Sequence, residues 1–136
     1  MEKEILQTLN FDLTAPSSYR FLQRFRKLTP ICNDDEVFFF AQYLQEIQLL
    51  DASLLKFKAS EIAAASLILA TKQIKKTICW NKDMEKFSGY TESQLAEVVK
   101  EVRSFCVEIN PKFISTLKYK FSKPEYKEVA KQTFKF

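Results

Sequence analysis

One stretch of the sequence decides the fold: Ser60 to Thr71, which reads SEIAAASLILAT. No charged residue occurs between Ile62 and Thr71, so a helix over this stretch is apolar on every face and belongs inside a bundle of other helices. Ten uncharged residues are too few to span a bilayer, which takes about 20. We therefore predict a central helix, with Ser60 as its N-cap and Glu61 beside its positive end.

The composition favours helices and a binding role over catalysis. The chain has 136 residues, of which 46% are apolar, and this is typical of a globular domain. Its single glycine, Gly89, disfavours strand-rich folds and phosphate-cradling loops. Histidine is absent, which removes the commonest general base and the commonest metal ligand. We therefore expect no catalytic, cofactor or metal site.

The cysteines point to a reducing compartment. Cys32, Cys79 and Cys106 are far apart, form no C-x-x-C pair and are odd in number. Reduced thiols in an intracellular protein fit this pattern, and Cys79 and Cys106 are expected to act as small core residues. We expect neither a signal peptide nor a membrane anchor.

Helical periodicity and capping signals predict further elements around the central stretch. A helix is predicted from Ser17 or Ser18 to about Leu28, and a second from Asn33 or Asp34 to about Leu50. After the central helix, a short turn over 83–87 is expected to close at Gly89. The capping box at 91–94 then starts a long amphipathic helix that ends at 110–111, and a last helical segment covers 113–121.

The net charge of +4 is unevenly distributed. From Lys112 onward there are seven lysines against two glutamates, and the remainder of the chain is slightly negative. The simplest interpretation of this tail is a solvated surface with lysine stems lying over apolar side chains. The alternative is phosphate binding together with Tyr119, Phe121 and Tyr126. The tail contains no arginine, the preferred reader of bases, so nucleic-acid binding is the less favoured interpretation.

Several motifs, occurring in register, resemble the A/B-type cyclins. Residues 1–13, MEKEILQTLNFDL, are similar to the end of the first cyclin box in that family. FLQRF at 21–25, YLQE at 43–46 and FKASEIAAA at 57–65 resemble successive helices of the second box. KYKFSK at 118–123 is similar to the terminal Lys-Tyr-rich signature. One departure is Lys58-Ala59, where many members have a proline.

The resemblance implies an all-α fold: a five-helix cyclin-box bundle around a central apolar helix, with an N-terminal helix and a C-terminal helical tail. Residues 1–16 would be the last helix of the first box and a linker, 17–110 the second box, and 111–136 the helical basic tail. The abrupt helical start, with no cap before it, suggests a chain cut from something longer.

The resemblance also implies a function and a set of contacts. The protein would be a regulatory subunit of a cyclin-dependent kinase in cell-cycle control, found in nucleus and cytoplasm, with no enzymatic activity of its own. Glu2, Leu6 and Leu13 match family positions that face the kinase. The glutamate bonds kinase backbone, and the leucines pack on the kinase's mobile helix, which moves inward and completes the active-site Lys–Glu pair. From residue types alone, both leucines are ordinary packing positions.

Two further expectations follow from the same comparison. The kinase would be held mainly by the missing N-terminal box, which carries the lysine that works with Glu2, so this C-terminal half is expected to support that box and not to activate a kinase alone. The alternative is a cyclin-fold transcription factor of the general B type, which binds promoter DNA through basic helices. The slightly negative charge before Lys112 disfavours that alternative.

Overall fold

The computed structural model describes residues 18–28, 33–50, 52–75 and 80–131. Within these ranges the chain forms six α-helices and no strand. The helices are α2 (Ser18–Phe25), α3 (Asp35–Gln48), α4 (Ala59–Lys75), α5 (Lys82–Ser88), α6 (Glu92–Glu108) and α7 (Ser115–Phe121). Short 3-10 turns lie at Ala52–Lys56, Pro111–Ile114, Pro124–Tyr126 and Val129–Lys131. The prediction of an all-α bundle is confirmed.

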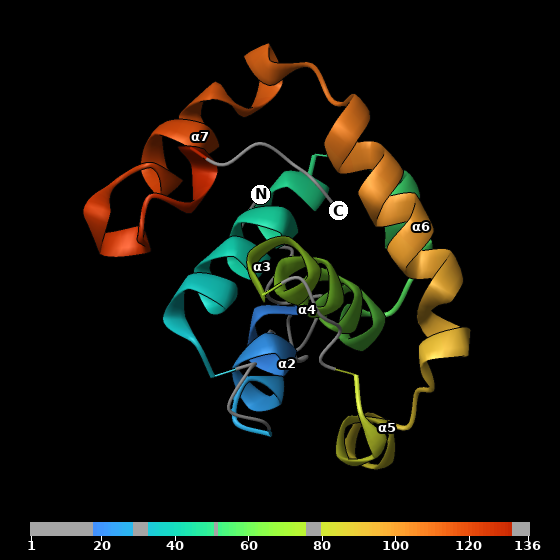
Figure 1. The fold of residues 1–136 in the computed structure, drawn as a ribbon. Helices are drawn as coiled ribbons and strands as arrows, with labels where there is room; N and C mark the ends of the chain where they lie inside the picture. The colour runs from blue at the N-terminus through green and yellow to red at the C-terminus, as the bar shows by residue number, and fades with distance from the viewer. Residues whose placement is uncertain (1–17, 29–32, 51, 76–79, 132–136) are drawn as a thin grey trace, which may run out of the picture.

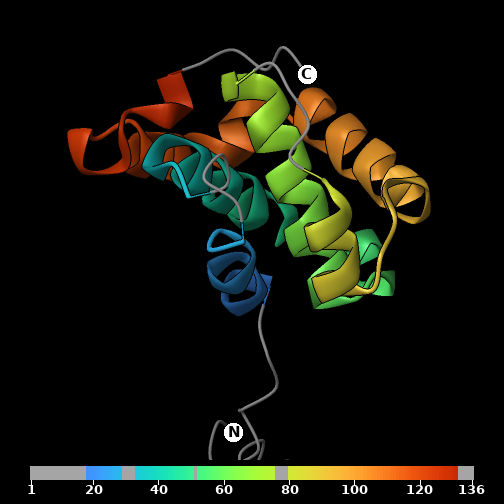
Figure 2. The same cartoon turned by 60° about the horizontal axis from the view of Figure 1, so that its bottom comes forward.

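Helix α4 is the centre of the bundle, as the uncharged stretch predicted. Figure 1 shows α2, α3 and α6 arranged around it, and Figure 2 shows it between α6 on one side and α3 with the C-terminal segment on the other. Every side chain from Ala63 to Thr71 is buried. The alanines among them, at 63, 64, 65 and 70, are fully buried, so the neighbouring helices approach this helix closely.

The predicted cap of α4 at Ser60 is wrong. The helix begins at Ala59, and the carbonyl of Lys58 already accepts a bond from the Ile62 amide at 3.0 Å, which makes Lys58 the N-cap. The Lys58 amide donates to Glu61 Oε1 at 3.2 Å. Glu61 therefore lies beside the positive N-terminal end of the helix, as predicted. The Ser60 hydroxyl instead lies 2.8 Å from the hydroxyl of Tyr90, at the start of the segment leading into α6.

The local signals at three other helix ends are confirmed, whereas the first predicted helix ends at Phe25 and not at about Leu28. Asp34 caps α3 by accepting from the amides of Glu36 and Val37. Gly89 ends α5 in the left-handed conformation, at φ 79°, which a glycine adopts without strain. Thr91 and Gln94 form the reciprocal capping box of α6, with bonds of 3.2 and 2.8 Å.

The segment after α6 packs back on α3. Phe121, Val129 and Ala130 are buried, and the ring of Phe121 lies 5.3 Å from that of Tyr43 between centroids. Lys120 Nζ lies 3.0 Å from Glu46 Oε1, and the same ammonium group lies over the Phe121 ring. This part of the basic tail therefore places a lysine ammonium group between a carboxylate of α3 and an aromatic ring.

Candidate docking groove on helix α2

The residues predicted to face a kinase, Glu2, Leu6 and Leu13, lie outside the residues that the structure describes. Their role stays a prediction. Among the described residues, no group of three or more histidine, cysteine, aspartate or glutamate side chains could hold a metal ion. No helix among them has both the length and the hydropathy that a membrane span requires.

Cys106 is the described cysteine, and it is a core residue. Its side chain is 2% exposed, and this burial raises the pKa of the thiol to about 12. Because the thiolate is the reactive form, a thiol with this pKa is not a nucleophile near neutral pH. The predicted role of Cys106 as a small hydrophobe is confirmed, and Cys32 and Cys79 lie outside the described residues.

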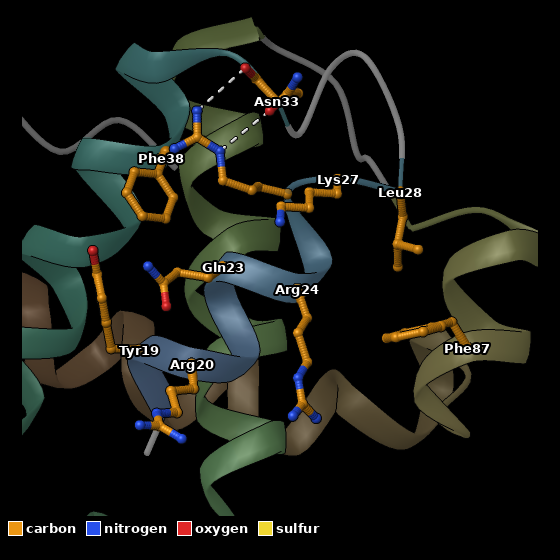
Figure 3. Close-up of a pocket in the computed structure, with 10 residues that line it drawn as sticks. Tyr19, Arg20, Gln23, Arg24, Lys27, Leu28, Asn33, Phe38 and Phe87 are labelled. Atoms are coloured by element: carbon orange, nitrogen blue, oxygen red, sulfur yellow. Dashed lines mark hydrogen bonds between the residues drawn. The ribbon is translucent and has the colours of Figure 1, made fainter. Parts of the chain in front are cut away.

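A groove lies over the outer face of α2, and we call it the α2 groove. Its volume is about 920 Å³. The lining side chains come from α2 and the turn after it, from the start of α3, and from α5; they are Tyr19, Arg20, Gln23, Arg24, Arg26, Lys27, Leu28, Asn33, Phe38 and Phe87. Figure 3 shows Tyr19 and Phe38 on one side of α2 and Leu28 and Phe87 on the other.

The charge of the groove lining is positive. It contains four cations, Arg20, Arg24, Arg26 and Lys27, and no carboxylate. The sequence of α2, SYRFLQRF, carries no acidic residue that could neutralise them from the same helix. The core-facing side of α2 explains the arrangement, because Leu22 and Phe25 are buried and force the long polar side chains onto the opposite face.

The Arg26 side chain is held in the structure and is not available to a ligand. Arg26 Nη2 lies 2.7 Å from Asp35 Oδ1, and its Nε donates to Asn33 Oδ1 at 3.3 Å. Its guanidinium carbon also lies 4.0 Å from the centre of the Phe38 ring. Arg26 therefore joins α2 to the start of α3 and fixes one end of the groove. Arg24 and Lys27 are exposed, and neither has an ion pair among the described residues.

Apolar rings flank the row of cations. Phe87 is 55% exposed, although its ring meets that of the buried Phe25 edge to face at 6.2 Å between centroids. Tyr19 is 39% exposed at the other end and lies 6.0 Å from Phe38 by the same measure. An exposed ring that is held in place by a buried neighbour offers apolar contact area with little loss of side-chain freedom on binding. The α2 groove can therefore bind a ligand that is both anionic and partly apolar.

Sequence reasoning found only part of this groove. The cationic part is local in the sequence, because Arg20, Arg24, Arg26 and Lys27 all lie within or just after the first described helix. Phe87 could not be assigned to the same surface, because it lies on a different helix about 60 residues further along the chain. The signal that the sequence offered was Phe87 itself, because the short helix 82–88 has no apolar stripe that would bury this ring.

The described residues form a small all-helical bundle with a groove over its first described helix. Residues 16–135 match the family model of the cyclin C-terminal domain. The chain is 31% identical to cyclin-A1-3 of Oryza sativa subsp. japonica over 97% of its length, which is 28% of that protein. It is 33% identical to human G2/mitotic-specific cyclin-B3 over 96% of its length, or 9% of that protein.

A third relative is G2/mitotic-specific cyclin-B2 of Rana japonica, which is 37% identical over 81% of the chain and 27% of that protein. The chain belongs to the cyclin family, with A-type and B-type cyclins among its relatives, and its match is to their C-terminal domain. It spans well under half of the length of these relatives.

Proposed function

We propose that this chain is the C-terminal part of a cyclin that regulates a cyclin-dependent protein kinase in cell-cycle control, acting in nucleus and cytoplasm. The observation that carries the proposal is the match of residues 16–135 to the cyclin C-terminal domain. The buried helix α4, with α2, α3 and α6 packed around it, supports it as the framework of such a domain. Its role would be to support a preceding cyclin box, which makes most of the contacts with the kinase.

The mechanism follows from the resemblance of the N-terminal residues. Leu6 and Leu13 would pack against the mobile helix of the kinase, and Glu2 would bond to kinase backbone. A cyclin that binds the inward position of that helix better than the outward position shifts the kinase toward its active state. No chemical step falls to the cyclin. The absence of histidine from the sequence and the raised pKa of the Cys106 thiol support a role without catalysis.

The test compares this chain with a form extended N-terminally by a first cyclin box. Each is mixed with a cyclin-dependent kinase, and binding and phosphorylation of a substrate are measured. The extended form is expected to bind and activate, and Leu6→Asp in that form is expected to abolish both. Leu49→Asp, at an exposed position of this domain, is the matched control and should leave them unchanged. Failure of the extended form to bind any such kinase would overturn the proposal.

A cyclin-fold transcription factor that binds promoter DNA is the second candidate. The observation in its favour is the cationic face of α2, which carries no acid. Three acidic residues disfavour DNA binding: Asp34, Asp35 and Glu36 lie together at the start of α3. This is the end of the α2 groove where Arg26 is paired with Asp35. DNA binding with a steep dependence on salt concentration would favour this second function.

A further inference from the structure

We propose that the α2 groove binds a short acidic peptide segment of a partner protein, with its carboxylates on Arg24 and Lys27 and an apolar side chain against Phe87. This site lies within the described domain and needs neither a first cyclin box nor a kinase. Its occupant is defined by the chemistry of the groove: spaced negative charges with an apolar residue between them.

The spacing of the cations indicates an extended ligand. Arg20 and Arg24 stand at helical positions i and i+4, which are about 6 Å apart along the axis at 1.5 Å per residue, and Lys27 lies in the turn that follows the end of α2. Cations arranged in a row do not converge on a single doubly charged group. An extended peptide rises about 3.3 Å per residue, so carboxylates on alternate residues match a row of this length.

The apolar component of the ligand has a defined partner. Figure 3 shows the Phe87 ring extending from α5 toward α2, with Leu28 nearby and Arg24 between them and the body of α2. Phe87 is 55% exposed, and its ring is oriented by Phe25, which is itself almost fully buried and meets Trp80 edge to face. A leucine or phenylalanine of the ligand that lies over Phe87 would remove this exposed ring from water.

The ends of the groove favour a peptide over a nucleic acid. At the α3 end, Arg26 is paired with Asp35 at 2.7 Å, and Lys75 pairs with the neighbouring Asp34 at 2.8 Å, so neither of these two cations is available to a ligand there. Single-stranded nucleic acids bind in charged channels that follow at least about four nucleotides. A row of this length, with carboxylates at its α3 end, is too short for such a channel but long enough for two carboxylates of a peptide.

The test is fluorescence anisotropy with the complete chain and a labelled peptide of about eight residues, in which glutamates alternate with leucine and phenylalanine. We expect saturable binding that weakens with added salt, and no binding of the same peptide with glutamine in place of glutamate. In the double variant Arg24→Glu/Lys27→Glu, affinity is expected to fall by at least about tenfold, because two charge-assisted contacts become repulsive. Phe87→Ser is expected to weaken binding severalfold.

The matched control is Lys72→Glu/Arg103→Glu. It makes the same change of charge in a smaller hollow of about 250 Å³ between α4 and α6. This control is expected to bind the peptide like the unmodified chain, and circular dichroism will show whether each variant retains its helices. Equal losses from both double variants would show that only net charge matters, and would overturn the proposal. So would the absence of binding, or tighter binding of a single-stranded oligonucleotide of equal charge.

Discussion

Gln48 and Ser66 form a buried hydrogen bond that joins α3 to the central helix. Gln48 Nε2 donates to Ser66 Oγ at 2.9 Å, and it also donates to the carbonyl of Leu44 at 2.9 Å. Both side chains are buried, and Gln48 Oε1 has no hydrogen-bond partner among the residues that the structure describes. The pair fixes where α3 meets α4, but it leaves one buried acceptor unpaired, which costs stability.

A double-mutant cycle on this pair is expected to show strong coupling. Ser66→Ala should destabilise the protein by about 1 kcal/mol, because it removes one partner and leaves the buried Gln48 amide less satisfied. Gln48→Leu combined with Ser66→Ala should recover most of that loss, since replacing both partners by apolar groups also removes the unpaired oxygen. Urea denaturation gives the free energy of unfolding of each variant. Purely additive effects of the two substitutions would contradict this account.

Asp34 both caps α3 and pairs with Lys75, and two substitutions distinguish these roles. Its Oδ1 caps α3 through the Glu36 and Val37 amides at 2.9 and 3.3 Å, and its Oδ2 lies 2.8 Å from Lys75 Nζ on α4. Asp34→Ala removes both interactions and is expected to cost about 1 kcal/mol. Asp34→Asn keeps a capping oxygen and loses only a partly exposed ion pair, so a loss of a few tenths of a kcal/mol is expected from thermal unfolding. Equal costs for the two variants would show that the cap contributes nothing.

The contribution of Asp34 to folding stability is expected to depend on pH in one direction. The hydrogen bond from Lys75 lowers the pKa of Asp34 below its ordinary value of 3.8. A carboxyl group whose pKa is lower in the folded state adds stability above its unfolded-state value, and this stability is lost as the pH falls through the folded-state pKa. The unmodified protein should therefore be more stable than Asp34→Asn by a constant amount above about pH 5, and this difference should shrink below about pH 3.8. An advantage that grew toward acid would contradict the assigned pairing.

The parts of the fold that sequence predicted are those with signals inside a few neighbouring residues. Burial of α4 follows from the ten uncharged residues after Glu61, because no orientation of such a helix exposes a charge. The caps at Asp34, Gly89 and Thr91 each depend on groups within four positions. Local chemistry was sufficient for these features.

The features that sequence missed depend on partners far away in the chain. Ser60 does not cap α4, because Tyr90, 30 residues later, lies within hydrogen-bond distance of its hydroxyl while Glu61 supplies the capping contact. The α2 groove likewise needs Phe87 beside Arg24, and no periodicity within one helix can predict that proximity. Glu2, Leu6 and Leu13 rest on the family resemblance alone and remain predictions.

Burial of Cys106 predicts its protection from alkylation. Desolvation raises the pKa of this thiol to about 12, so almost none of it is thiolate at about pH 8. In the folded protein, iodoacetamide is therefore expected to leave Cys106 unmodified, and the residue should react fully in concentrated urea. Mass spectrometry of the peptide that contains Cys106 measures its modification separately from Cys32 and Cys79. Equal rates of reaction with and without urea would show that this face of α6 is not packed as described.

The attachment of the C-terminal segment to α3 is expected to depend on one ring and only slightly on its ion pair. Phe121 is fully buried, its ring lies 4.8 Å from that of Tyr126, and the neighbouring Lys120 pairs with Glu46 at the surface. Phe121→Ala should lower the free energy of unfolding by about 3 kcal/mol or more, because it opens a cavity between this segment and α3. Lys120→Ala should cost less than about 1 kcal/mol, since a partly exposed ion pair contributes little.

Hydrogen exchange distinguishes detachment of this segment from a general loosening of the fold. In Phe121→Ala, amides of 115–131 should lose protection before those of α4. A larger loss of stability in Lys120→Ala than in Phe121→Ala would mean that charge, and not burial, holds this segment in place.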